Sequence, residues 1–132
     1  MHDTTPPLSI AFDNSYVRLP ERLFARVEPT AVAAPSWVAF NADLARRMGL
    51  DEATLSSAAG LEVFCGNRLP QGSEPLAMAY AGFQFGGWAP LLGDGRAILL
   101  GEVVGEDGTR WDIQLKGSGP TPFSRRGDGR AV

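Results

Sequence analysis

The clearest pattern in the chain is a strict alternation of apolar and polar residues over positions 110–116. One face of an extended strand there carries Trp111, Ile113 and Leu115. A mostly apolar run at 97–104 precedes it, and the glycine-containing segment 105–108 separates the two. A turn signal between two strand patterns predicts a β-hairpin, with Lys116 ending the second strand on its polar face.

A different period predicts helices in the first half of the chain. Apolar residues recur at every fourth position in Phe40, Leu44 and Met48. Ser36 is a good helix cap before them, and Gly49 is a good terminator after them. Asp51 is the predicted N-cap of a second, shorter helix that runs to about residue 59.

The other segments complete an α+β prediction. Ser73, Glu74 and Pro75 resemble a helix start, so residues 76–80 are predicted as a helical body. Residues 117–132 are rich in Gly, Pro and Arg and are predicted as loop. We expect residues 1–11 to be disordered and residues 12–132 to form one domain, with a small antiparallel sheet beside the helices.

Composition narrows the functional classes. The chain is 44% hydrophobic and 20% charged, which is ordinary for a soluble domain. With a pI near 5.1 and no basic patch that alternates with aromatics, we expect no nucleic-acid partner. Neither a signal peptide nor a membrane span is predicted. A lone Cys65 excludes an internal disulfide, and together with these two absences it fits a reducing cytoplasm. The Arg- and Ala-rich, Lys-poor composition favours a bacterium with a GC-rich genome.

The net charge of −3 is unevenly distributed. Residues 116–132 carry four basic side chains against the single acid Asp128; they are Lys116, Arg125, Arg126 and Arg130. A basic segment of this kind suits a phosphate-bearing ligand, although it also fits an ordinary surface loop.

Two features next to the predicted hairpin could bind phosphate. Gly93 and Gly95 flank a turn whose backbone N–H groups can approach an anion closely, and Arg96 adds a cationic fork. Lys116 follows one hairpin later, which is the layout by which kinase-like folds place a phosphate-binding lysine. Taken singly, the first feature also fits a plain turn, and the second fits a solvent-facing lysine.

The third candidate is the pair Asp128 and Gly129, which could contact a base or ribose or form an Asx-type turn. The only histidine, His2, lies in the expected disordered terminus, so no Ser-His-Asp set is plausible. We find no kinase catalytic loop and no metal-ligand motif in the chain. No catalytic residue and no metal ligand is therefore predicted within it.

Six short motifs, taken together, resemble the SelO (selenoprotein O) family over residues 12–132. They are Tyr80-Ala81-Gly82-Phe83-Gln84-Phe85-Gly86, Leu92-Gly93-Asp94-Gly95-Arg96-Ala97, Leu100-Gly101-Glu102, Gln114-Leu115-Lys116-Gly117, Thr121-Pro122 and Asp128-Gly129-Arg130-Ala131-Val132. The chain departs from the family at Phe83, where many members have His, and at Phe123, where many have Tyr. Neither position is an expected nucleotide contact.

The resemblance implies the N-terminal lobe of a protein-kinase-like fold. It also implies a protein adenylyltransferase that moves AMP from ATP to Ser, Thr or Tyr hydroxyls of proteins, with Mg²⁺ or Mn²⁺. Carried over position by position, the expected nucleotide contacts are Gly93, Gly95, Arg96, Lys116, Asp128 and Gly129. Family members are several times longer, so the catalytic Asp and the metal ligands are expected beyond residue 132.

Two alternatives stay open from the sequence. One keeps the fold but transfers a phosphoryl group in place of AMP. The other is a non-catalytic fragment that acts at most as a nucleotide-binding module. If the chain is part of an adenylyltransferase, we expect the 132 residues alone to be inactive in AMP transfer, because no catalytic base or metal ligand is predicted within them.

Overall fold

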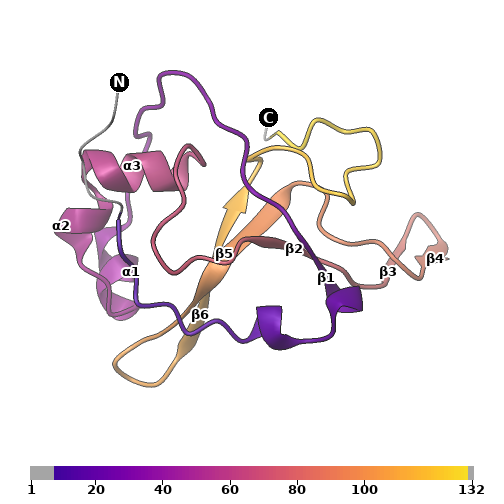
Figure 1. Cartoon of the computed structure of the whole chain (residues 1–132), viewed down its shortest axis with the longest axis horizontal. Helices are drawn as coiled ribbons and strands as arrows, with labels where there is room; N and C mark the ends of the chain where they lie inside the picture. Colours follow the sequence, from indigo (N-terminus) through magenta and orange to yellow (C-terminus); the bar gives the residue numbers. More distant parts are fainter. Residues whose placement is uncertain (1–7, 131–132) are drawn as a thin grey trace.

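A four-stranded antiparallel sheet in the order β1-β2-β5-β6 forms the centre of the computed structural model, which describes residues 8–130 (Figure 1). Its strands are β1 (Phe24–Arg26), β2 (Leu76–Met78), β5 (Ala97–Val104) and β6 (Arg110–Lys116). A separate two-stranded hairpin consists of β3 (Gly82–Gln84) and β4 (Gly87–Ala89). The helices are η1 (Tyr16–Arg18), η2 (Glu21–Leu23), α1 (Ala42–Arg47), α2 (Glu52–Leu55) and α3 (Ala58–Phe64). The α+β class predicted from the sequence is therefore confirmed.

The long hairpin of β5 and β6 has the bounds that the sequence predicted. Ile113 and Leu115 are buried on one face of β6, and the polar residues between them are exposed. The pairing runs from Val104 opposite Arg110 to Ala97 opposite Lys116, with an irregularity near Gly101. The turn 105–109 lies at the opposite end of the hairpin from Lys116, and the loop 117–130 follows that lysine (Figure 1).

Strand β5 is buried on both faces because each face of the sheet meets a different apolar cluster. Leu100 and Val103 pack with the helices and with Leu8 and Ile10. On the other face, Leu99 packs with a cluster formed by β1 and β2. Each fully buried side chain of this size stabilises the fold by ~1.5–3 kcal/mol.

The chain before η1 lies close over β5. At Gly101, an added Cβ would lie 2.4 Å from the Phe12 ring, so the close approach requires glycine. Leu8 and Ile10 are only 4% and 5% exposed, so the packed part begins before residue 12, where the sequence placed the start of the domain. The rest of the predicted disordered segment, residues 1–7, lies outside the described residues.

The predicted first helix begins later than expected. Asn41, and not Ser36, is the cap of α1, because its side chain accepts the N–H of Leu44 at 3.0 Å. Asp51 caps α2 as predicted. That helix stops at Leu55, and α3 begins anew after Ser57 over a segment that the sequence left partly undecided.

The predicted helix over 76–80 is wrong, because residues 76–78 form strand β2. β2 pairs with β1 on one side and with β5 on the other, so both of its backbone edges are hydrogen-bonded. Leu76 and Ala77 are both buried, so the strand lacks the alternation that marks a half-exposed one.

The start of α1 gives a direct test of the cap. Asn41→Ala is expected to lower the free energy of unfolding by ~1 kcal/mol, because the Leu44 N–H loses its acceptor. Ser36→Ala serves as the control and should leave stability unchanged. Urea denaturation of the two variants measures both values. Equal losses would contradict the helix start seen here.

Candidate functional site

The turn from Gly93 to Arg96 is held against the segment that follows β2. The N–H groups of Leu92 and Gly93 donate to the Tyr80 carbonyl at 2.7 and 3.1 Å. The Asp94 N–H donates to the Met78 carbonyl at 2.9 Å. Gly93 has φ +66°, a conformation that side chains with a Cβ rarely adopt. The turn is therefore fixed before β5 begins.

Lys116 lies beside this turn because of the hairpin register. Its Cα partner is Ala97, the residue directly after Arg96. The Gly117 N–H donates to the Arg96 carbonyl at 2.7 Å, which ties the two strand ends together. Lys116, Arg96, Gly93 and Gly95 line one cavity of about 340 Å³.

A second cavity of about 400 Å³ adjoins the first and shares four lining residues with it: Tyr80, Gly93, Gly95 and Arg96. Its far side is formed by residues 123–130, including Asp128 and Gly129. The structure therefore brings all six sequence-predicted residues around two adjoining cavities.

Gly129 occupies a position where only glycine fits. Its φ is +70°, and an added Cβ would lie 1.9 Å from the Gly119 carbonyl oxygen. The neighbouring Asp128 accepts the N–H of Arg130 at 2.9 Å, which is the Asx-type turn considered from the sequence. The turn occupies one carboxylate oxygen, and Asp128 itself is exposed at the second cavity.

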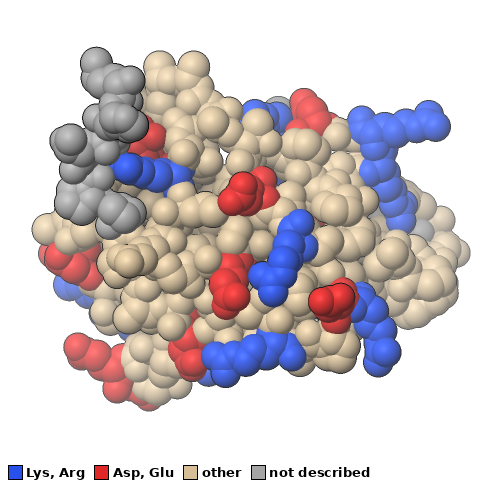
Figure 2. All heavy atoms as spheres, in the orientation of Figure 1, with Lys and Arg blue, Asp and Glu red and all other residues tan. Residues whose placement is uncertain are grey.

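The cavities carry more positive than negative charge. Four basic side chains line them against two acids: Lys116, Arg96, Arg125 and Arg130, against Asp94 and Asp128. Within residues 8–130, none of these four cations forms an ion pair with an acidic side chain. Figure 2 shows basic side chains projecting on the side of the molecule where the loop after β6 lies in Figure 1. Such a surplus attracts anionic ligands.

Sequence reasoning missed a polar network in the first cavity. The Tyr80 hydroxyl donates to Asp94 Oδ1, and Gln114 Nε2 donates to Asp94 Oδ2 at 3.3 Å. The hydrogen bond to Asp94, with a smaller effect of burial, raises the pKa of Tyr80 to about 12. Both Tyr80 and Asp94 lie within the family motifs, but nothing in their spacing predicts that they meet.

The Tyr80 pKa can be tested by its ultraviolet absorbance in a Tyr16→Phe variant, in which Tyr80 is the only tyrosine. In the folded chain the phenol should ionise near pH 12, and in the urea-unfolded chain near its ordinary value of 10.0. Because the folded pKa is the higher one, the interaction stabilises the fold below pH ~10 and loses that effect as pH rises toward 12. Adding Asp94→Asn should lower the pH at which Tyr80 is half ionised in the folded chain. If Tyr80 ionised near pH 10 with Asp94 still in place, that result would contradict the network.

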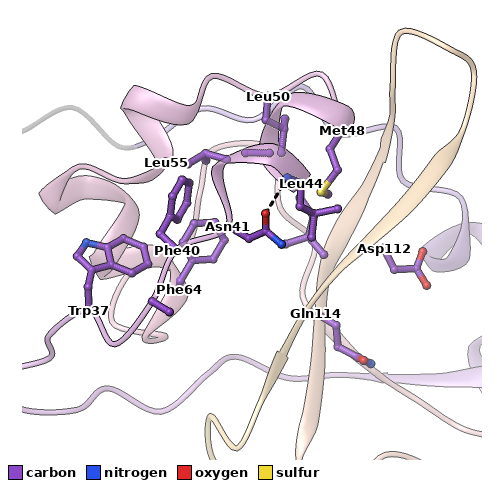
Figure 3. Close-up of a pocket in the computed structure, with 13 residues that line it drawn as sticks. Trp37, Phe40, Asn41, Leu44, Met48, Leu50, Leu55, Phe64, Asp112 and Gln114 are labelled. Atoms are coloured by element: carbon purple, nitrogen blue, oxygen red, sulfur yellow. Dashed lines mark hydrogen bonds between the residues drawn. The ribbon is translucent and has the colours of Figure 1, made fainter.

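A third cavity, of about 300 Å³, lies on the helical side of the hairpin (Figure 3). Trp37, Phe40 and Phe64 gather on one side of it, and Asp112 and Gln114 of β6 lie on the other. Burial raises the pKa of Asp112, and the nearby charge of Glu102 adds to the effect. The lining is mainly apolar and none of the predicted contacts lies there.

The remaining sequence expectations concern metals and membranes. In the described part of the chain, no group of three or more His, Cys, Asp or Glu side chains is placed to hold a metal ion. No helix among residues 8–130 is long and apolar enough to cross a bilayer. Glu102 is buried and accepts the backbone N–H groups of Ser15 and Tyr16.

Fold and site together define an α+β domain in which a glycine turn, a strand lysine and a basic loop surround adjoining cavities, as in proteins that bind phosphate groups. A family model described as protein adenylyltransferase SelO matches residues 6–132. The chain belongs to the SelO family, and the resemblance drawn from its motifs is confirmed.

Three relatives illustrate how much of the family the chain spans. Proteins named protein nucleotidyltransferase YdiU from Alkalilimnicola ehrlichii and Methylorubrum populi are each 68% identical to it, over 91% and 92% of this chain. A protein of the same name from Rhodopseudomonas palustris is 63% identical over 92% of this chain. The alignments cover 24%, 24% and 25% of those relatives, so the chain spans about a quarter of their length.

Proposed function

We propose that this chain is the nucleotide-binding part of a protein adenylyltransferase. The observation that carries the proposal is the convergence of Gly93, Gly95, Arg96, Lys116, Asp128 and Gly129 around two adjoining cavities. The names of the family and of its relatives support the same activity. In this proposal Lys116 and Arg96 bind phosphate oxygens of ATP, the glycine turn brings its backbone close to them, and Asp128 and Gly129 contact the nucleoside end.

The proposed reaction is AMP transfer to a protein. The hydroxyl oxygen of a Ser, Thr or Tyr side chain attacks the α-phosphorus of ATP and forms the new O–P bond. The bond between the α-phosphorus and the α,β-bridging oxygen breaks, pyrophosphate leaves, and the hydroxyl proton passes to a base. This chain's part is to bind and orient the triphosphate, and we expect the base outside residues 8–130.

A divalent ion, Mg²⁺ or Mn²⁺, belongs to the proposal as a cofactor that would screen the triphosphate charge. The described residues hold no cluster of metal-ligating side chains, so they do not fit a metal site by themselves. We expect its ligands in the part of the family's length that this chain does not span. The kinase-like fold is likewise proposed, and the order of glycine turn, strand, hairpin, strand and lysine supports it.

Titration of the 132-residue chain with ATP in a calorimeter is the first test, and measurable binding is expected. The second test uses a chimera in which this chain replaces the matching quarter of the Alkalilimnicola ehrlichii relative. We expect α-phosphate label from ATP on protein with the chimera and no labelling with the chain alone. Transfer of label from the γ-phosphate by the chimera would identify a kinase. Absence of ATP binding in the calorimeter would contradict the proposed function.

A further inference from the structure

The loop after β6 makes contacts with the glycine turn that the proposed nucleotide contacts do not include. Thr121 is 8% exposed, and its hydroxyl donates to the Asp94 carbonyl at 2.5 Å. The Ser124 hydroxyl donates to the Gly95 carbonyl at 2.6 Å. Two consecutive carbonyls of the turn are thus bonded by two side chains from one short segment.

These two side chains are themselves fixed by their own turn. The Thr121 N–H donates to Ser124 Oγ at 2.7 Å, and the Ser124 N–H donates to the Thr121 carbonyl at 3.1 Å. The Phe123 N–H donates to Thr121 Oγ1 at 3.1 Å. Each hydroxyl therefore accepts one hydrogen bond within the loop and donates one to the glycine turn, which sets the direction of both donors.

The Phe123 ring fills the space that side chains on the turn would need. A Cβ added to Gly93 would lie 2.5 Å from the ring, and one added to Gly95 would lie 2.9 Å from the Phe123 carbonyl oxygen. The loop and the turn are therefore in close contact over both glycines. Movement of either segment would break the two hydroxyl bonds together.

We propose that Thr121 and Ser124 are positioning residues that hold the Gly93–Arg96 turn in its phosphate-binding conformation. Their bonds to the turn are made to backbone carbonyls, so they act on a nucleotide through Arg96 and the turn backbone. A preformed turn binds an anion without first losing the conformational freedom of a mobile one. The inference rests on the proposed function, because it assigns a purpose to a contact beside the same site.

Two substitutions remove the hydroxyls with little change in shape, Thr121→Val and Ser124→Ala. Thr121→Ser keeps the hydroxyl and is the rescue variant. Ser73→Ala is the matched control, because the Ser73 hydroxyl donates to the Leu100 carbonyl at 2.6 Å, in the sheet and away from both cavities. It removes the same kind of bond without touching the turn.

The first measurement is amide hydrogen exchange in the chain without ligand, which does not depend on ATP. The N–H groups of Leu92, Gly93 and Asp94 are bonded to carbonyls at the end of β2 and just after it, and they should exchange about tenfold faster in Thr121→Val and Ser124→Ala. Thr121→Ser and Ser73→Ala should leave their rates unchanged. Unchanged exchange in both hydroxyl-deletion variants overturns the proposal.

The second measurement is ATP affinity by calorimetry, at a temperature where every variant is folded by circular dichroism. Thr121→Val and Ser124→Ala should each weaken binding about tenfold, and Thr121→Ser should restore it to within about twofold. Faster exchange with unchanged affinity overturns the positioning role. If the unchanged chain binds no ATP, the proposed function fails, while the exchange result still decides whether the loop holds the turn.

Discussion

Replacing Lys116 by methionine is expected to weaken ATP binding by about 30-fold to 150-fold, which is the loss of a charged hydrogen bond to a phosphate worth ~2–3 kcal/mol. Lys116 is exposed at the end of β6, lines the first cavity and forms no ion pair within the described residues. Methionine keeps most of the aliphatic stem and removes the ammonium group. The fold should remain intact, because the Lys116 side chain forms no hydrogen bond or ion pair within residues 8–130.

The control for this prediction is Arg22→Met. Arg22 is an exposed cation on η2, away from the residues that line either cavity, so it tests whether overall charge alone changes affinity. Calorimetry at two salt concentrations should show little change in ATP affinity with Arg22→Met. Comparable losses for the two variants would mean that the protein attracts ATP by net charge and that Lys116 has no specific role.

Glu102→Ala is expected to lower the free energy of unfolding by ~2–3 kcal/mol, the largest stability loss that we predict, because buried hydrogen-bond donors lose a charged acceptor. Glu102 is 5% exposed and accepts the N–H groups of Ser15 and Tyr16, each at 2.7 Å, and the Ser15 hydroxyl at 2.6 Å. Arg110 lies 3.3 Å away on β6 and completes the contacts of the carboxylate. Alanine leaves these donors without their acceptor and removes the side-chain bonds that join the start of η1 to β5.

The loss of unfolding free energy in Glu102→Ala should become smaller as the pH falls. Burial favours the neutral form of Glu102, but the hydrogen bonds from Ser15 and Tyr16 and the charge of Arg110 outweigh it and lower its pKa below 4.5. A lowered folded pKa means that the contribution is complete above pH 4.5 and is lost as pH falls through the folded value. The difference between the unchanged chain and Glu102→Ala should therefore narrow in acid.

Asp112→Asn is the matched control for Glu102→Ala. Asp112 is the cross-strand Cα partner of Glu102, but its side chain is far less buried than that of Glu102 and forms no ion pair in the described part of the chain. The Asp112→Asn substitution should change the free energy of unfolding by no more than ~0.5 kcal/mol. Equal losses of unfolding free energy for the two variants in urea denaturation would show that the hydrogen bonds of Glu102 with Ser15 and Tyr16 do not stabilise the fold.

The sequence predicted the β5–β6 hairpin well because two signals coincided there. Residues 110–116 have one buried and one exposed face, which produces a period of two, and Gly105 and Gly108 mark the turn. The same reasoning failed for Leu76, Ala77 and Met78, which are covered on both faces and show no period. Strand β1 is only three residues long and was missed for lack of any pattern.

The six predicted nucleotide contacts could be identified from the sequence because several signals coincide there. The hairpin pattern, the glycine turn and the family motifs all fall in the same part of the chain. The bonds of Tyr80, Thr121 and Ser124 to the turn could not be predicted in this way. They join segments that are 14, 27 and 29 residues apart in sequence, and their existence depends on packing that no local pattern encodes. The family motifs include Tyr80 and Thr121 but not Ser124, and they do not reveal what these residues contact.

The turn of the long hairpin gives experimenters a place to attach a reporter. Gly108 has no atom within 4 Å of the position that a Cβ would occupy, and the residues around it are exposed. Lys116 is the last residue of the seven-residue strand that follows this turn, so the two ends lie roughly 20 Å apart. A short peptide tag or a fluorophore inserted next to Gly108 would project into open solvent and leave the cavities accessible, so nucleotide binding could be followed optically without labelling the site itself.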